Sequence, residues 1–259
     1  TANLPGLVFQ FVAMPDGNMN VTFADGRIEE ILGLSREKEG LFTQFAEQIH
    51  PDFINPFMQS VKDSVKNFTP WSFEGKFNKP SGETIWIRGL STPFRREPSK
   101  VFNGIISDIT EHKQAELKIE KLNRLYLVRS NINQSIIKIK EPEKLFNEVC
   151  RIAVEDGKFI MAWIGILNSL TNKVEVAASY GKTNGYLDTI NIDLNDETRN
   201  LGPTGTTIKT GKYNYCKDIE NDERMAPWRE KAVKLGYRSS ISLAIKISGN
   251  TYGTVTLYS

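Results

Sequence analysis

The sequence predicts an α+β protein of two domains, each built on a roughly five-stranded antiparallel sheet with flanking helices. The chain has 259 residues, and at about 150 residues per domain this length indicates two small domains that can each bury a core. Strand-like segments in both halves have short connections, which require antiparallel neighbours because a parallel pair needs a long crossover. A long helical pattern separates the halves. We therefore expect domains at residues 1–110 and 140–259, joined by a helix at 111–139.

In the first domain we expect two strands, several helices and three further strands. The segments LVFQFVA and MNVTFA flank a Pro-Asp-Gly turn, which is typical of a hairpin. A period of four in Phe53, Phe57, Val61 and Val65 predicts a helix, and Gly33 is expected to end a shorter helix before it. Strand patterns return in WSFEGKF, TIWIRGLSTPF and VFNGIIS.

The connecting helix carries an imperfect apolar stripe. Its positions, spaced by three and four, are Ala115, Ile119, Leu122 and Tyr126, followed in a shifted phase by Leu125, Arg129, Ile132, Ile136 and Ile139. Such a stripe could pack on the helix's own neighbouring domain or on the same helix of a second chain. The residues leave both readings open, and the second predicts a homodimer.

The second domain begins with the helical segment PEKLFNEVCRIAVED, which has Pro142 in its first turn. Strands FIMAWIGIL and KVEVAASYG follow, then a loop-rich stretch at 182–212, the strand YNYC, the helix PWREKAVKLG and a closing hairpin. No terminal helix follows the last strand, so we expect the chain to be a piece of a longer protein.

Composition excludes several function classes. The chain is 39% hydrophobic and 25% charged with a net charge of +2, so neither disorder nor a nucleic-acid partner is indicated. No apolar run approaches the roughly 20 residues that cross a bilayer, which predicts no membrane contact in this fragment and a cytoplasmic location. Cys150 and Cys216 belong to no CxxC pair, which argues against a disulfide framework or a zinc site.

Catalytic patterns are missing as well. There is no nucleophile elbow or HExxH motif, and with only His50 and His112 a histidine-rich metal centre is excluded. His50 precedes Pro51 at the start of a helix, where a capping hydrogen bond is the preferred role. We expect no metal and no enzymatic activity in this fragment.

Two families are recognisable in particular motifs. HPDF at 50–53, SGETIWIRG at 81–89 and GIISDITEHKQAE at 104–116 resemble a PAS domain. CRIAVEDGKFIMAWIG at 150–165, GPTGTTIKTGKY at 202–213, RMAPWREKAVKLGYRSS at 224–240 and YGTVTLYS at 252–259 resemble a GAF domain that lacks its C-terminal helix. The order is similar to the sensory region of prokaryotic sensor histidine kinases and diguanylate cyclases. The resemblance implies a ligand-accessible pocket in each domain and an output domain outside this chain.

The resemblance also implies that the helix after the Asp-Ile-Thr junction is a signalling helix. Asp108 and Thr110 would fix its root, and Asp108 is expected to pair with a basic residue of the sheet, for which Arg88 is the candidate. The alternative for Asp108 is a carboxylate that caps the helix.

Aromatic residues supply the pocket candidates. In the GAF half the candidates are Trp163, Tyr180, Tyr186, Trp228 and Tyr237, with Arg224 or Arg238 as an anchor for an anionic group. In the PAS half Phe9, Phe23, Trp71, Phe73 and Trp86 lie on strands. All of these aromatics can equally be plain core, and sequence does not distinguish an enclosed cavity from a filled one.

Cofactor expectations depend on cysteine. No cysteine precedes Cys150, which excludes flavin photochemistry through a PAS cysteine. Cys216 is a candidate thiolate ligand for haem, although a small packed residue is the favoured alternative. Taken together, these features predict a sensory fragment, most simply of a two-component histidine kinase. This fragment is expected to bind a small molecule and to act through a dimeric helix. The alternatives are a structural or dimerising module without a ligand and a haem-based redox or gas sensor.

Overall fold

The computed structural model describes residues 6–36, 40–95 and 98–259. The chain divides into two compact units, Thr1–Ile119 and Glu120–Ser259, and each is described by itself. Within the described ranges, no helix combines the length and hydropathy needed to cross a lipid bilayer.

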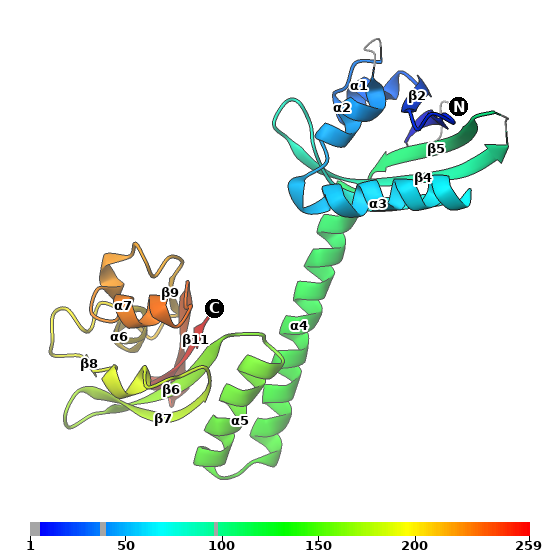
Figure 1. The fold of residues 1–259 in the computed structure, drawn as a ribbon. Helices are drawn as coiled ribbons and strands as arrows, with labels where there is room; N and C mark the ends of the chain where they lie inside the picture. The colour runs from blue at the N-terminus through cyan, green and yellow to red at the C-terminus, as the bar shows by residue number, and fades with distance from the viewer. Residues whose placement is uncertain (1–5, 37–39, 96–97) are drawn as a thin grey trace. The chain divides into compact units, whose positions relative to one another are not determined.

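The first unit is built on one antiparallel sheet of five strands in the order β2-β1-β5-β4-β3 (Figure 1). The strands are β1 (Leu7–Ala13), β2 (Met19–Ala24), β3 (Trp71–Asn78), β4 (Thr84–Arg95) and β5 (Lys100–Asp108). Between β2 and β3 lie α1 (Arg27–Leu32), α2 (Leu41–Glu47) and α3 (Pro51–Asn67). The predicted order of two strands, helices and three strands is confirmed.

Alternation along the strands decides which face becomes the core. Leu7, Phe9 and Phe11 of β1 are buried, and so are the alternate residues Trp71 and Phe73 of β3, because every second side chain of a strand points to the same face. The helices cover this face. As expected, Gly33 ends α1 in the left-handed conformation with φ of 68°, and the ring nitrogen Nδ1 of His50 accepts a hydrogen bond from the backbone N–H of Asp52 at the start of α3.

Helix α4 runs without interruption from Thr110 to Lys138, so the predicted joining helix is confirmed as one continuous element. Its residues up to Ile119 belong to the first unit, and those from Glu120 belong to the second.

The second unit contains α5 (Pro142–Glu155), α6 (Pro203–Thr210) and α7 (Arg229–Lys234) with short 3₁₀ turns η1 (Leu187–Thr189) and η2 (Glu223–Met225). Its strands are β6 (Met161–Asn168), β7 (Lys173–Gly181), β8 (Ile192–Asp193), β9 (Asn214–Cys216), β10 (Ser240–Ile247) and β11 (Asn250–Tyr258). They form an antiparallel sheet in the order β8-β7-β6-β11-β10-β9. The sixth strand, β8, lies in the stretch expected to be loop and has only two residues, too few for a visible alternation.

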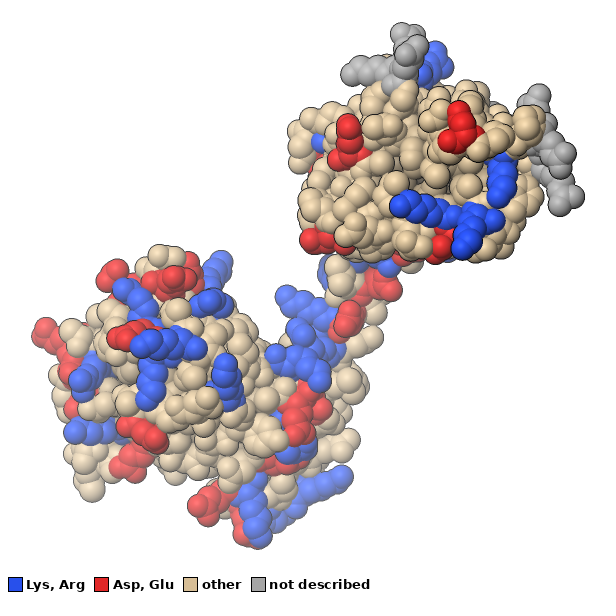
Figure 2. Space-filling view, in the orientation of Figure 1, with Lys and Arg blue, Asp and Glu red and all other residues tan. Residues whose placement is uncertain are grey.

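Helices cover both faces of this second sheet. Ala162 and Ile164 of β6 pack with α5, whereas Met161 and Trp163 belong to the core on the opposite face, where α6 lies against β10 and β11. On the view in Figure 2, positive and negative side chains are interspersed over this unit, as the small net charge leads us to expect.

Candidate functional site

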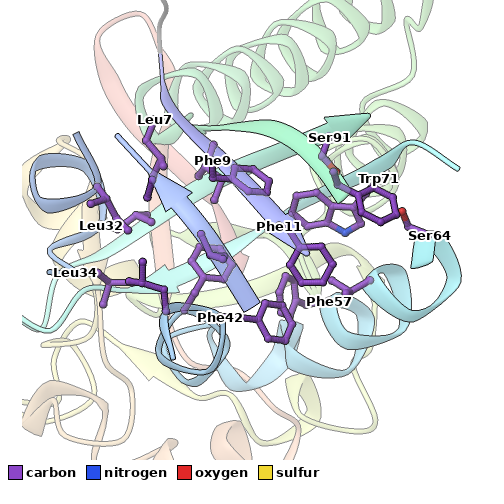
Figure 3. Close-up of a pocket in the computed structure, with 18 of the residues that line it drawn as sticks. Leu7, Phe9, Phe11, Leu32, Leu34, Phe42, Phe57, Ser64, Trp71 and Ser91 are labelled. Carbon is purple, nitrogen blue, oxygen red and sulfur yellow. The ribbon is translucent and has the colours of Figure 1, made fainter. Parts of the chain in front are cut away.

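The PAS-like unit encloses an apolar cavity between its sheet and its helices (Figure 3). Its volume is about 60 Å³, several times the roughly 10–15 Å³ that one water molecule needs. The lining residues come from β1, β2, the three helices, β3, β4 and β5; they include Leu7, Phe9, Phe11, Leu41, Phe42, Phe45, Phe57, Val61, Trp71 and Phe102. No charged side chain lines the cavity among the described residues.

Two serine hydroxyls are the polar groups in this wall. Ser64 Oγ donates a hydrogen bond to the carbonyl oxygen of Thr69 at 2.7 Å, so its proton is already used. Ser91, on β4, is buried, and no hydrogen bond of its hydroxyl is found within the described part of the chain. Trp71 turns its ring to the cavity while its Nε1 donates to Ser60 Oγ at 2.9 Å. Among the described lining residues, Ser91 is thus the one whose hydroxyl proton is free to be donated to a guest, whereas Ser64 Oγ can only accept.

The five aromatic candidates of the PAS half separate into three groups. Phe9 and Trp71 line the cavity, and Phe73 packs in the core beside it, with its ring centroid 5.1 Å from that of Phe57. Phe23 is 53% exposed, because its position opposite Gln10 places it on the outer face of the sheet. Trp86 lies away from the cavity, near the root of α4.

At the root of α4, the expected pair between Asp108 and Arg88 is not formed. The sheet register sets Arg88 opposite Ser107 and Asp108 opposite Ile87, so the two side chains leave opposite faces of the sheet. Arg88 instead lies 3.4 Å from Glu74 on β3. Asp108 takes the alternative role, because its Oδ1 accepts a hydrogen bond from the backbone N–H of Thr110 at 2.8 Å.

Thr110 joins α4 to the sheet. Its Oγ1 accepts a hydrogen bond from the backbone N–H of Trp86 at 2.9 Å, and the backbone N–H of Ile109 donates to the carbonyl of Trp86 at 2.8 Å. One turn later, Lys113 Nζ lies 3.1 Å from Glu74 and 3.1 Å from Glu116. Hydrogen bonds to Glu116 and Glu74 raise the pKa of Lys113 above its usual value.

Three of the GAF candidates come together around a fourth residue. The rings of Tyr186 and Tyr237 lie 5.6 and 4.8 Å from the ring of Tyr258, and Trp163 shares their core. All four are almost fully buried, and burial raises the pKa of Tyr237 and of Tyr258 to about 12. The cluster is packed, and none of its residues lines the PAS cavity or a polar recess between α4 and α5.

The remaining GAF candidates lie elsewhere. Trp228 packs on the edge of the same core and meets Gly202, where an added Cβ would come within 2.9 Å of its ring. Tyr180 donates its hydroxyl to Glu155 at 2.6 Å on the α5 side. Arg224 is occupied by Asp222 Oδ2 at 2.6 Å, with Asn214 and the carbonyl of Tyr215 each at 3.1 Å. Arg224 therefore fastens η2 to β9 and has little capacity left for an anionic ligand.

Neither cysteine has the character of a reactive thiolate. Burial raises the pKa of the Cys216 thiol to about 11 and that of Cys150 to about 12, whereas metal ligation and nucleophilic attack need the deprotonated form. Within the described ranges, no group of three His, Cys, Asp or Glu side chains is arranged to hold a metal ion. Cys216 is buried and belongs to the same core as Tyr237 and Tyr258.

Sequence reasoning missed Ser91, Glu74, Lys113 and Tyr258. Ser91 sits between Leu90 and Thr92 on β4, and only the inward phase of the strand marks it. Lys113 and Glu116 have the spacing of a helical ion pair, so this pair could have been predicted from the sequence. The contact of Lys113 with Glu74 could not, because it depends on how the helix leaves the sheet.

The fold defines an α+β protein of two domains, one of which contains an apolar cavity. A family model described as a PAS fold matches residues 21–106, and a model of the GAF domain matches residues 140–259. The chain therefore consists of a PAS domain followed by a GAF domain, which makes it a sensory module of signal transduction. A search of curated proteins found no match.

Several solved structures resemble parts of the chain. A GAF domain of a phosphoenolpyruvate-protein phosphotransferase from Coxiella burnetii is 15% identical over 53% of this chain and 78% of its own, with a TM-score of 0.42. The N-terminal domain of a diguanylate cyclase with a PAS/PAC sensor from Marinobacter aquaeolei is 15% identical over 41% and 98%, with a TM-score of 0.37. The chromophore-binding domain of Stigmatella aurantiaca bacteriophytochrome is 14% identical over 98% and 85%, with a TM-score of 0.37. Likeness at this level says nothing about ligand or activity.

Proposed function

We propose that this chain is the sensory part of a signalling protein whose PAS domain binds a small, uncharged, mainly apolar molecule. The observation that carries the proposal is the cavity, whose described lining is aromatic and aliphatic with one free hydroxyl, on Ser91. A charged guest would be excluded, because burying an unpaired charge costs far more than such contacts return. A guest with an apolar body and one polar group fits the wall best.

The state of the cavity is proposed to reach an output domain through α4, and we expect that output domain to be a histidine kinase. The support is the resemblance of residues 104–116 to the junction that precedes signalling helices, together with the bonds from Trp86 to Ile109 and Thr110 that fix the root of α4. A helix moves as a stiff element because every turn is held by backbone hydrogen bonds.

The partner is proposed to be a second copy of this chain. In the GAF unit, α4 turns polar residues to α5: Asn131, Gln134, Ser135 and Lys138 line the recess between the two helices, and Asn131 donates to Asp156 at 2.8 Å. Val128 and Ile132 are half-buried, but most of its large apolar side chains are exposed. Leu122, Leu125, Tyr126, Leu127, Ile136 and Ile137 are 48–71% exposed. A helix that leaves this many large apolar side chains exposed to solvent is suited to pairing with another helix.

A second candidate role applies to the GAF domain alone. Its predicted pocket aromatics are packed against Tyr258, which favours a structural or dimerising role for this domain over binding of a ligand by those residues.

The test uses fluorobenzene and 4-fluorophenol as probes, followed by fluorine NMR as the chain is added. Binding should broaden both probe signals. Ser91→Leu, which puts an isobutyl group into the cavity, should abolish the broadening, whereas Thr92→Leu places the same group on the exposed outer face and should leave it intact. Ser91→Ala should weaken the binding of 4-fluorophenol and leave the binding of fluorobenzene unchanged. If neither probe responds, or if both leucine variants bind like wild type, the proposed binding in this cavity is wrong.

A further inference from the structure

We infer that Lys113 is the residue that positions the first turn of α4 against the Trp86 ring, and thereby couples α4 to the helix that forms a wall of the PAS cavity. The inference rests on the proposed function in one respect only, that the PAS cavity is the sensing site. It concerns how a change in the cavity would reach α4.

Lys113 makes three contacts at once. Its ammonium lies 3.1 Å from Glu74 on β3 and 3.1 Å from Glu116 on its own helix. It also lies 5.9 Å from the centre of the Trp86 ring, within the roughly 6 Å at which a cation is attracted to an aromatic face. Its side chain is 25% exposed, so the contacts are partly shielded from water. The Lys113 ammonium is thus in contact with the sheet, with its own helix and with the Trp86 ring.

Trp86 connects two helices. Through its backbone it is bonded to Ile109 and Thr110 at the start of α4. Through its ring it meets Phe53 of α3 edge to face, with centroids 5.4 Å apart and planes at 77°, a favoured aromatic geometry. Lys76 lies 5.7 Å from the same ring. A displacement of Phe53 therefore moves the ring on which Lys113 rests.

Phe53 belongs to the same helix as the cavity wall. Four residues after it, Phe57 is 1% exposed and lines the cavity, and side chains four apart lie on one face of a helix. Phe57 is held by Phe45 at 5.6 Å and by Phe73 at 5.1 Å. A guest that shifts Phe57 shifts α3, and with it Phe53. The route then runs from Phe57 to Phe53, Trp86 and Lys113.

The competing explanation is that Lys113 forms only an ordinary surface ion pair. Exposed pairs of this kind contribute little to stability. The two explanations differ in what they predict. If Lys113 only makes a surface ion pair, its loss changes the stability of α4 by the same amount whatever the state of the cavity. If Lys113 is a positioning residue, a change in the cavity alters the stability of α4 only when Lys113 is present. A double-mutant comparison distinguishes the two explanations, because the effects of substitutions at independent sites add, whereas those at connected sites do not.

The experiment measures amide hydrogen exchange of residues 111–119 in the full chain for wild type, Phe57→Leu, Lys113→Met and the double variant. Phe57→Leu removes ring volume from the cavity wall, and Val61→Ala is a smaller change in the same wall should Phe57→Leu fail to fold. In the wild-type background the wall substitution is expected to speed exchange about threefold, in line with the loss of one cation-aromatic contact. In the Lys113→Met background it is expected to have no further effect.

Two controls and one spectroscopic signature complete the test. Lys113→Arg keeps a cation over the ring and should restore the response, and Lys118→Met, an exposed lysine of the same helix, should respond like wild type. With 5-fluorotryptophan incorporated, the Trp86 resonance, assigned with Trp86→Phe, should shift in Phe57→Leu and in Lys113→Met.

Equal effects of the wall substitution in both backgrounds, or a Lys113→Arg variant that behaves like Lys113→Met, would overturn the inference. No guest molecule is used. If the cavity binds neither probe, the exchange result is still valid. If the effects of the two substitutions on exchange simply add, the probe-binding result is still valid.

Discussion

At the scale of single residues, some charged side chains in this protein fasten loops and helix ends. Asp222 shows this most clearly. The hydrogen bonds from Arg224 hold the pKa of its carboxyl at about 2, compared with an ordinary value of 3.8, and its side chain is 19% exposed. The pair joins η2 to β9, because Arg224 also contacts Asn214 and the carbonyl of Tyr215.

The depressed pKa of Asp222 gives a prediction with a definite sign. Its stabilising effect is fully present above about pH 4 and is lost as the pH falls toward 2, because the folded state must then take up a proton that the unfolded state binds more readily. Asp222→Asn should therefore speed hydrogen exchange of residues 214–225 at pH 6, and the difference from wild type should shrink as the pH approaches 2. Glu223→Gln, whose parent side chain is 89% exposed, is the control. A difference independent of pH would contradict the assignment.

Sequence reasoning found residues of the right kind more often than their partners. Trp163, Tyr186 and Tyr237 do cluster, but Tyr258, which joins them, lies on the last strand and reads as one more strand aromatic. Arg88 was a sound candidate for an ion pair. Its partner is set by the strand register, which places Arg88 directly opposite Glu74, whereas Asp108 lies opposite Ile87 and therefore on the other face. The cavity was unreadable for another reason, since a void depends on how many side chains jointly fill a space.

At the scale of elements, the root of α4 is the feature most open to test. Asp108→Ala removes the acceptor for the Thr110 N–H, and loss of such a cap costs about 1 kcal/mol. We expect faster hydrogen exchange at residues 110–113 and an unchanged exchange pattern in the PAS sheet.

Asp108→Asn keeps an acceptor oxygen and should behave nearly as wild type. Slow exchange in Asp108→Ala, equal to that of wild type, would mean that the bond from Thr110 Oγ1 to β4 is enough to hold the first turn.

Elements were predicted well where a period was long and poorly where it was short. The four-residue period in α3 and the alternation in β3 locate those elements within a few residues. The two residues of β8 carry no period at all, and pairing with β7 alone makes them a strand. Tertiary context decides such short pieces.

At the scale of the whole molecule, the exposed apolar side of α4 predicts association. Leu125→Glu and Ile136→Glu, introduced together, should convert a dimer to a monomer in sedimentation velocity, because two charges would be forced into the seam between the helices. Lys121→Glu changes the charge of an exposed polar position on the same helix and is the control.

A wild-type chain that sediments as a monomer at every concentration would show that this helix does not pair. A dimer that survives both substitutions would place the interface elsewhere.

The GAF sheet ends in two very short strands, β8 with two residues and β9 with three. Unpaired strand edges are the places where proteins add foreign strands and begin to aggregate. Each of the two short strands covers only one end of its longer neighbour: β8 pairs with two residues of β7, and β9 pairs with three residues of β10. In the described sheet, residues 175–181 of β7 and 243–247 of β10 therefore have no strand partner on that side. A charged side chain stands in each of these two stretches, Glu175 in one and Lys246 in the other, and burying such a charge against a neighbouring copy opposes the addition of a foreign strand.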